Sequence, residues 1–297
     1  MARVLVTGAS GFVGSALVAA LSERGWAVRA ASRTRLPFAN ACIVGDLGPD
    51  TDWRAALEGV DAVVHLAGPA HARYSAAELE RAIVLGAAAL AAQARAAGVS
   101  RFVFVSSIKA IAAHAPGSML AEGDAPNPQD RYGRAKLSAE REVLEHVGEA
   151  VLVLRPPLVF GADAKRNFRH LLAIADTNIP LPFAGIENRR SLISLASLIE
   201  AILATLTKRD GPSGVFHVAD RPALSTPAII DALRRGLGRP TRQFSAPGIS
   251  MFTPPALTES LAIDDSHFRT VYGYGPRTET DVSAALEQCA RDWKAGR

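Results

Sequence analysis

A glycine-rich turn near the start of the chain constrains its fold more than any other feature. The apolar run Arg3–Thr7 leads directly into a turn with glycines at positions 8, 11 and 14, and a helical pattern follows over Phe12–Arg24. Glycines at this spacing between a strand and a helix are typical of a dinucleotide-binding βαβ unit, in which free N–H groups at the helix N-terminus bind a pyrophosphate. The rest of the chain decides between this interpretation and a glycine-rich turn without a ligand.

Short apolar runs and longer helical patterns alternate through the first half of the chain. This alternation predicts an α/β fold, a doubly wound parallel sheet of the Rossmann type with helices on both faces. The strands are expected at Arg3–Thr7, Ala27–Ser32, Ala41–Val44, Ala62–Leu66, Phe102–Ser106 and Val151–Leu154. The helices are expected at Phe12–Arg24, Ala76–Ala97 and Tyr132–Val147.

The rhythm changes after Arg155-Pro156-Pro157, where proline-rich connections separate shorter elements. A smaller, C-terminal substrate-binding domain is therefore expected to begin there. One later run, Val215–Ala219, has the composition of a strand and is expected to return to the main sheet. The predicted Rossmann domain thus comprises 1–157 and 190–220, and the smaller domain comprises 158–189 and 221–297.

Composition narrows the classes of function. At 297 residues and 48% hydrophobic, the chain can bury a large core. Its net charge of +4 is spread along the chain, which argues against nucleic-acid or membrane binding but is compatible with an acidic small molecule. Cys42 and Cys289 are far apart, so no metal site is expected, and the chain starts in a strand pattern, which favours a cytoplasmic protein. The alanine-rich run from Glu78 to Gly98 is interrupted by charged residues and reads as a packed helix.

Cofactor contacts are expected along one edge of the sheet, because ligands of doubly wound folds bind at the carboxyl ends of the strands. Asp46 could accept a hydrogen bond from an adenine amino group, or it could be a solvated turn residue. Ala67 and Gly68 would let the cofactor lie against the backbone, whereas His65 is expected to fill the strand end without a catalytic role. The full predicted set is Gly8, Ser10, Gly11, Phe12, Val13, Gly14, Ser32, Arg33, Asp46, Leu47, Leu66, Ala67, Gly68, Tyr132, Lys136 and Pro156.

The end of the second strand indicates which dinucleotide is preferred. An enzyme that uses NAD usually carries Asp or Glu there to hold the ribose hydroxyls, but this chain has Ser32-Arg33. Ser32 could donate to a phosphate oxygen and Arg33 could pair with it, with Arg35 as a second candidate. NADP(H) is therefore favoured over NAD(H), unless these arginines are ordinary surface charges.

Three polar side chains are the candidates for catalysis. Tyr132 and Lys136 are four residues apart at the start of a predicted helix, so both lie on one face. The positive charge of Lys136 is expected to lower the pKa of the Tyr132 phenol, which is near 10 in water. Ser107 follows the fifth strand and so reaches the same sheet edge, where its hydroxyl could hold a substrate oxygen. Alone, each would be a chance pair or a turn residue, but together they indicate a proton-transfer site.

With Thr7–Gly14, His65–Gly68, Ser106-Ser107 and the Tyr132-x-x-x-Lys136 pair in this order, the chain resembles the extended short-chain dehydrogenase/reductases. More specifically, it resembles the NAD-dependent epimerase/dehydratase family. Two further stretches typical of its nucleotide-sugar enzymes are Arg155–Gly161 and Tyr272–Pro276. The resemblance implies that Ser107, Tyr132 and Lys136 are catalytic.

The resemblance also implies contacts to the substrate. Ser107 would hold the reacting group, and Asn167 and Arg190 would contact a nucleotide diphosphate. Arg190 stands where an arginine usually precedes an Asp-Tyr pair in this family, but Ser191-Leu192 follows it here. A solvated arginine is the alternative at this position.

The residues after Ser107 help to choose among the chemistries of the family. Sugar dehydratases carry an acidic pair there and fucose-synthase-like epimerases a Cys, but this chain has Ile108-Lys109. The expectation is an NADP(H)-dependent oxidoreductase that reduces a C4 keto group of a UDP-linked, N-acetylated 6-deoxy sugar in surface-polysaccharide synthesis. A UDP-sugar 4-epimerase with bound NAD is the nearest alternative, and a non-catalytic NADP-sensing protein is a third. A homodimer could form through the alanine-rich helix and the Tyr132 helix.

Overall fold

A seven-stranded parallel sheet forms the centre of the computed structural model, which describes residues 2–36, 40–69, 74–115, 117, 119–164, 167–208, 210–274 and 281–296. In spatial order the strands are β10 (Gly214–His217), β7 (Val151–Arg155), β5 (Arg101–Val105), β4 (Ala62–His65), β1 (Arg3–Thr7), β2 (Ala27–Ser32) and β3 (Ala41–Ile43). The predicted α/β class is confirmed. The predicted bounds of β1 and β2 are correct, and the late strand does return to the main sheet.

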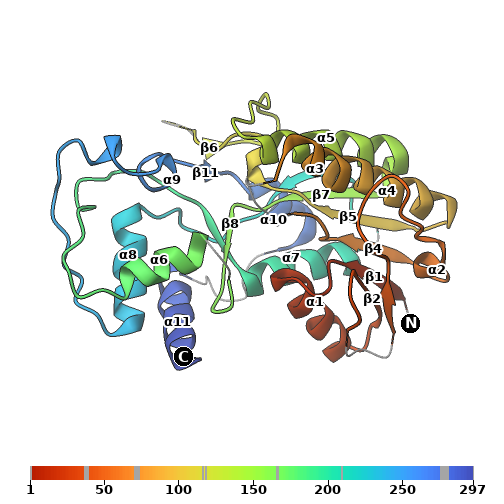
Figure 1. Cartoon of the computed structure of the whole chain (residues 1–297), viewed down its shortest axis with the longest axis horizontal. Helices are drawn as coiled ribbons and strands as arrows, with labels where there is room; N and C mark the ends of the chain where they lie inside the picture. Colours follow the sequence, from red (N-terminus) through yellow and green to blue (C-terminus); the bar gives the residue numbers. More distant parts are fainter. Residues whose placement is uncertain are drawn as a thin grey trace.

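Both faces of the sheet are covered by helices, as Figure 1 shows. The helices α1 (Phe12–Glu23) and α7 (Leu195–Thr207) pack on one face, and α4 (Gly86–Ala96) and α5 (Arg131–Val147) pack on the other. Every residue of β5 (RFVFV) and β7 (VLVLR) is buried. A strand that is buried on both faces needs a continuous apolar run, which explains why these strands could be predicted from the sequence.

The predicted helix over Ala76–Ala97 differs from the observed one. It consists of α3 (Ala76–Leu79), a π-helical segment η1 (Glu80–Leu85) and α4. A π-helical turn inserts an extra residue without ending the helix, so hydrophobic periodicity does not reveal it. At the junction Gly86 lies against the loop after β3, where an added Cβ would be 3.3 Å from the Cβ of Leu47.

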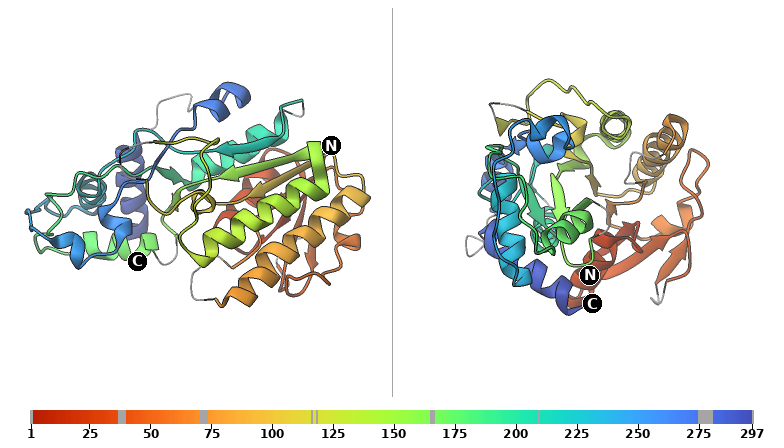
Figure 2. Two further views of the ribbon diagram at one scale, coloured as in Figure 1. Left: turned by 90° about the horizontal axis from the view of Figure 1, so that it is seen from above. Right: turned by 60° about the vertical axis from the view of Figure 1, so that its left-hand side comes forward.

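A second apolar core lies beside the sheet, at the end toward the C-terminus (Figure 2). It is built by α6 (Asn167–Ala175), α8 (Thr226–Leu237) and α11 (Val282–Ala295). Helices α8 and α11 cross closely, since a Cβ at Gly236 would lie 2.2 Å from the carbonyl oxygen of Glu287. We propose that this core is the smaller domain.

The other elements are short. They are the paired strands β8 (Leu158–Phe160) with β9 (Leu192–Ser194) and β6 (Met119–Leu120) with β11 (Ala262–Ile263), the helices α2 (Arg54–Leu57), α9 (Pro255–Thr258) and α10 (Ser266–Tyr272), and the 3₁₀ turns η2 (Ile108–Ala110), η3 (Gly148–Ala150) and η4 (Ile249–Met251). None of the helices in the described ranges is long and apolar enough to span a membrane.

Helix α10 departs from the predicted division of the chain, which assigned all of 221–297 to the smaller domain. Phe268 and Tyr272 of this helix belong to the core under the large sheet. Their rings lie 5.8 Å and 5.5 Å from the ring of Phe216 in β10. Aromatic packing therefore returns this segment to the Rossmann domain, an arrangement that depends on contacts distant in sequence.

Candidate functional site

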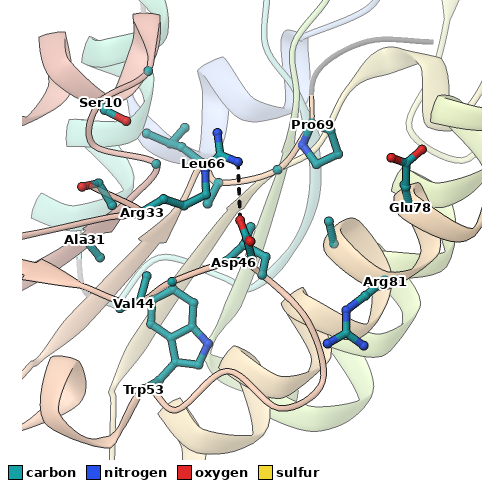
Figure 3. A pocket seen from close by; sticks show the side chains of 18 of the residues that line it. Ser10, Ala31, Arg33, Val44, Asp46, Trp53, Leu66, Pro69, Glu78 and Arg81 are labelled. Carbon is teal, nitrogen blue, oxygen red and sulfur yellow. Dashed lines mark ion pairs between the residues drawn. The ribbon is translucent and has the colours of Figure 1, made fainter. Parts of the chain in front are cut away.

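A pocket of about 570 Å³ opens at the carboxyl ends of β1 to β4, where the sequence predicted a cofactor (Figure 3). This size is ordinary for a small-molecule site. The predicted cofactor residues that line it are Gly8, Ser10, Gly11, Ser32, Arg33, Asp46, Leu47, Leu66, Ala67 and Gly68. Four segments far apart in the sequence are thus brought to one cavity.

The glycine loop has a geometry that requires glycine. Gly8 adopts a φ of 68°, in the left-handed region, and a Cβ there would lie 2.9 Å from the backbone nitrogen of Ala67. A Cβ at Gly14 would lie 2.2 Å from the carbonyl oxygen of Gly8, so only glycine lets α1 start this close to the turn. The loop therefore exposes its backbone at the N-terminal end of α1, where anions bind.

Six predicted cofactor residues do not line the pocket: Phe12, Val13, Gly14, Tyr132, Lys136 and Pro156. The Phe12 ring packs on Gly161, where an added Cβ would meet it at 2.8 Å, and Val13 packs against the core of the sheet. Gly14 serves the helix packing just described. The carbonyl oxygen of Pro156 accepts a hydrogen bond from the backbone of Ile108 at 2.9 Å.

At the rim of the pocket, Arg33 and Asp46 form an ion pair, with Nη1 and Oδ1 3.5 Å apart (Figure 3). Their side chains are 75% and 91% exposed. The buried Ser32 hydroxyl donates to the carbonyl oxygen of Thr34, so it is not directed at a phosphate as the sequence suggested. Of the predicted 2′-phosphate contacts that line the pocket, Arg33 is the one with an exposed charge.

Sequence analysis missed one wall of the pocket. Trp53, Tyr74, Glu78 and Arg81 line it. The Arg81 guanidinium lies against the loop after Asp46. A Cβ added at Gly48 in this loop would come within 3.0 Å of the guanidinium. These residues follow strand ends by variable intervals, so no fixed spacing signals them.

The catalytic candidates Tyr132 and Lys136 lie in the first two turns of helix α5, outside the lining of this pocket. Asp130 caps the helix by accepting from the Gly133 backbone at 2.7 Å. Lys136 is buried, and its Nζ donates to the Val105 carbonyl oxygen at 2.9 Å. The same Nζ lies 6.0 Å from the centroid of the Tyr132 ring, on the shared face that the spacing predicted.

The ionisation of this pair differs from the expectation. Burial, together with the charge of Asp130, raises the pKa of Tyr132 well above its usual value near 10. Burial lowers the pKa of Lys136 to about 8, and the carboxylate of Glu140 opposes that shift. The predicted lowering of the Tyr132 pKa is not seen in this structure, where desolvation of the phenolate is the largest cause of the shift. Tyr132 is therefore a neutral, protonated phenol at neutral pH.

Ser107 lies where β5 ends, and its neighbour Ser106 points elsewhere. The Ser107 Oγ accepts from the Lys109 backbone at 3.2 Å and caps η2, whereas the Ser106 hydroxyl donates to Glu140 at 2.5 Å. The turn η2 packs closely on α5, since a Cβ at Gly133 would lie 2.2 Å from the Lys109 carbonyl oxygen. Ser107 and Tyr132 are thereby held on neighbouring elements.

The predicted substrate contacts on the C-terminal side are only partly described. Arg190 is half-buried, burial lowers its pKa, and its Nη1 donates to the Glu259 carbonyl oxygen at 2.8 Å. The side chain of Asn167 lies outside the described residues. No group of three or more potential metal ligands occurs in the described ranges.

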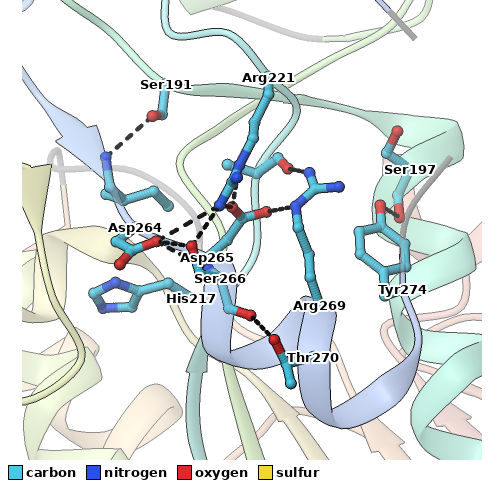
Figure 4. A network of polar contacts seen from close by, with 12 residues as sticks. Ser191, Ser197, His217, Arg221, Asp264, Asp265, Ser266, Arg269, Thr270 and Tyr274 are labelled. Carbon is cyan, nitrogen blue, oxygen red and sulfur yellow. Dashed lines mark hydrogen bonds and ion pairs between the residues drawn. The ribbon is translucent and has the colours of Figure 1, made fainter. Parts of the chain in front are cut away.

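The described part of the closing motif, which starts at Tyr272, connects helix α10 to helix α7 (Figure 4). The Tyr274 hydroxyl donates to the Ser197 carbonyl oxygen at 2.7 Å, and the Arg269 guanidinium lies 5.5 Å from the Tyr274 ring. Arg269 and Arg221 both pair with the buried Asp265, at 2.6 Å and 2.5 Å. This part of the motif ties α10 to α7, and Gly275 and Pro276 lie outside the described residues.

Comparisons with known proteins agree with this geometry. The model of the NAD dependent epimerase/dehydratase family matches residues 4–219. UDP-glucose 4-epimerase of Vibrio cholerae is 32% identical over 300 residues, which cover 92% of this chain and 90% of the relative. The solved structure of MoeE5 in complex with UDP-glucuronic acid and NAD is 26% identical, with a TM-score of 0.81 and 99% of each chain covered.

A third comparison concerns the fold alone. The UDP-N-acetylglucosamine 4-epimerase from Bacillus cereus is 19% identical with a TM-score of 0.83, and the match covers 99% of this chain and 100% of that one. The Rossmann sheet, the glycine loop and the Ser, Tyr and Lys set thus occur together in a chain matched over most of its length. This chain belongs to the NAD dependent epimerase/dehydratase family, as an enzyme of the short-chain dehydrogenase/reductase class.

Proposed function

We propose that this enzyme reduces a C4 keto group of a UDP-linked sugar with NADP(H), in surface-polysaccharide synthesis. The observation that carries the cofactor choice is Arg33, which follows β2 and lines the pocket where a carboxylate would favour the ribose hydroxyls of NAD. A 2′-phosphate would replace Asp46 as the partner of this guanidinium, in a charge-assisted contact. The reduced cofactor, when bound, supplies a hydride.

The side chains of the enzyme perform the proton chemistry. Tyr132 donates its phenolic proton to the carbonyl oxygen as that oxygen gains negative charge, which leaves a tyrosinate. The Lys136 ammonium stabilises this anion, and the Ser107 hydroxyl donates to the same substrate oxygen and orients the carbonyl. Solvent then returns a proton to Tyr132, so one substrate molecule is reduced for each hydride consumed.

A 4-epimerase is the second candidate, and the similarity to UDP-glucose 4-epimerase of Vibrio cholerae favours it. In that reaction Tyr132 would first accept a proton from the C4 hydroxyl and later return it to the opposite face. The cofactor would stay bound, because it is oxidised and reduced within one turnover. The two candidates share the catalytic residues and differ in cofactor exchange.

One experiment separates them. Purified enzyme is given a UDP-linked 4-keto-6-deoxy-N-acetyl sugar with NADPH, and in parallel UDP-glucose or UDP-N-acetylglucosamine without added cofactor. The reductase oxidises one NADPH per sugar and leaves the second pair of substrates unchanged. If the protein instead retains NAD through purification and equilibrates the C4 epimers without net oxidation, the epimerase proposal replaces the reductase proposal.

We further propose that Arg190 and Asn167 contact the diphosphate of the substrate. Charge-assisted hydrogen bonds contribute about 1.5–3 kcal/mol, so Arg190→Ala is expected to weaken UDP binding by that amount in calorimetry. The exposed neighbour Arg189 provides the control, since Arg189→Ala should bind UDP as the wild type does. Unchanged affinity in the Arg190 variant would place the nucleotide elsewhere.

A further inference from the structure

A buried charged cluster lies one helical turn beyond Lys136. Glu140 of α5 pairs with Arg155 at the end of β7, with Oε2 and Nη2 2.5 Å apart and the side chains 2% and 6% exposed. The Arg155 Nε also donates to Oε1 of Glu140 at 3.0 Å, and the Ser106 hydroxyl donates to the same oxygen at 2.5 Å. The cluster therefore joins α5 to the ends of two neighbouring strands of the sheet.

Two side chains of helix α5 form hydrogen bonds to consecutive residues at the end of β5. Lys136 and Glu140 are four residues apart on its buried face. The Lys136 ammonium donates to the carbonyl oxygen of Val105, and the Glu140 carboxylate accepts from the hydroxyl of Ser106. The next residue in the chain is Ser107, so these contacts determine where its hydroxyl is placed.

We propose that Glu140 is a positioning residue for this site: it anchors the strand end that carries Ser107, and its buried carboxylate keeps Lys136 in the ammonium form. The inference rests on the proposed function in assigning the chemistry to Ser107, Tyr132 and Lys136. An ammonium at this position is what stabilises the tyrosinate left when Tyr132 gives up its proton. A neutral amine would lack the charge for that task.

The groups that face Lys136 explain why Glu140 has this effect. Tyr132, on the same helix, is a neutral phenol, and Asp130 at the helix start is paired with Lys109 at 2.7 Å. On β7 Arg155 adds positive charge, which Glu140 balances. Among the described charged groups, Glu140 is the one whose charge raises the Lys136 pKa against burial.

His65 on β4 is also neutral, and its hydrogen bonds show which tautomer it adopts. The Thr7 hydroxyl accepts from the backbone nitrogens of Leu66 and Ala67, at 3.2 Å each, and so has its own proton left to donate. That proton goes to Nδ1 of His65 at 2.7 Å, which places the ring hydrogen on Nε2. Burial and the charge of Lys136 lower the pKa of His65 to about 3, so the His65 ring is uncharged at neutral pH.

The test titrates Lys136 directly and does not depend on activity. The chain has five lysines, at positions 109, 136, 165, 208 and 294, so enzyme labelled with ¹³C at lysine Cε gives few resonances, and Lys136→Met identifies the one of interest. In the wild type this resonance should titrate near pH 8. In Glu140→Gln the midpoint should move to lower pH, and kcat should fall with KM for the substrate nearly unchanged.

Glu142→Gln is the matched control, because Glu142 lies on the same helix with its side chain 41% exposed and pairs with His146. Its Lys136 midpoint and kcat should equal those of the wild type. If Glu140→Gln does not fold, the double variant Glu140→Met/Arg155→Met removes both charges and leaves neither unpaired. The Lys136 midpoint should again move to lower pH, but by less than in Glu140→Gln, because the positive charge of Arg155 is removed as well.

The outcomes separate the two proposals. A Lys136 midpoint that is the same in the Glu140 variants as in the wild type overturns the role of Glu140. Full turnover in Lys136→Met overturns the proposed catalytic assignment instead, whatever the titration shows.

Discussion

Two arginine–carboxylate pairs lie at the same edge of the sheet and differ in almost every respect. Arg33 and Asp46 meet at 3.5 Å across the rim of the cofactor pocket, with side chains 75% and 91% exposed. Arg155 and Glu140 meet at 2.5 Å between β7 and α5, with side chains 6% and 2% exposed. The first pair joins two loops, and the second joins a helix to a strand.

This difference in burial determines whether each pair can exchange partners. An exposed pair contributes at most about 1 kcal/mol, so a ligand phosphate can replace its carboxylate at little cost. A buried pair cannot exchange partners, because removal of one partner leaves an uncompensated charge in a dry environment. The rim is therefore suited to select a cofactor, and the buried pair is suited to hold catalytic groups in position.

The largest effect is expected at Tyr132, which lies on the same helix as Glu140. General acid catalysis contributes about a hundred- to ten-thousandfold, so Tyr132→Phe should lower kcat by that factor. Cofactor affinity should stay within a few fold, because the ring is retained. Tyr272→Phe, which changes a tyrosine of the core under the large sheet that does not line the pocket, should keep its turnover. Turnover equal to that of the wild type in Tyr132→Phe would remove this residue from the mechanism.

A second test compares the stability contributions of the two pairs directly. Arg155→Met leaves Glu140 buried without its partner and should lower the free energy of unfolding by about 3–5 kcal/mol in urea denaturation. Arg33→Met should change it by less than about 1 kcal/mol, because that pair is solvated. Equal losses in the two variants would show that burial does not distinguish these pairs.

A third test asks whether the rim selects the cofactor. If Arg33 binds a 2′-phosphate, Arg33→Ala should weaken NADPH binding by about 1.5–3 kcal/mol and leave NADH affinity unchanged. Arg35→Ala tests the second candidate and should have the smaller effect, since Arg33 is the one that lines the pocket. Tighter binding of NADH than of NADPH by the wild type would contradict the proposed preference.

The smallest effect is a pH dependence from His65. Its pKa falls from the usual 6.5 to about 3 on folding, so below pH 6.5 the unfolded chain binds a proton that the folded chain does not. Stability is therefore complete above pH 6.5 and decreases as the pH falls toward 3, by about 2 kcal/mol between pH 7 and pH 5.

The variant His65→Asn isolates this contribution, because an amide oxygen can still accept from Thr7 and does not titrate. Its unfolding free energy should depend less on pH than that of the wild type. The buried His217, whose pKa is also lowered, acts in the same direction and remains in both proteins. Parallel pH profiles for the two proteins would show that His65 does not stay neutral in the fold.

Much of the large sheet was predictable because its central strands are buried on both faces. Continuous apolar runs such as Val4–Val6 and Val151–Leu154 have few other ways to satisfy burial, and glycines mark the turns between elements. Helix α10 was not predictable in the same way. Its rings could pack on either core, and the choice depends on Phe216, which lies 52 residues before Phe268.

The sequence by itself determined the glycine loop, the order of the elements and the shared face of Tyr132 and Lys136. These features depend on residues within one or two turns of each other, where spacing alone specifies geometry. Tertiary structure decided that the Ser32 hydroxyl contacts Thr34, that Arg33 reaches Asp46, and how Tyr132 and Lys136 ionise. The reason is that a pKa or an ion pair depends on burial and on charges from distant segments, as Glu140 and Arg155 illustrate, and spacing carries no information about either.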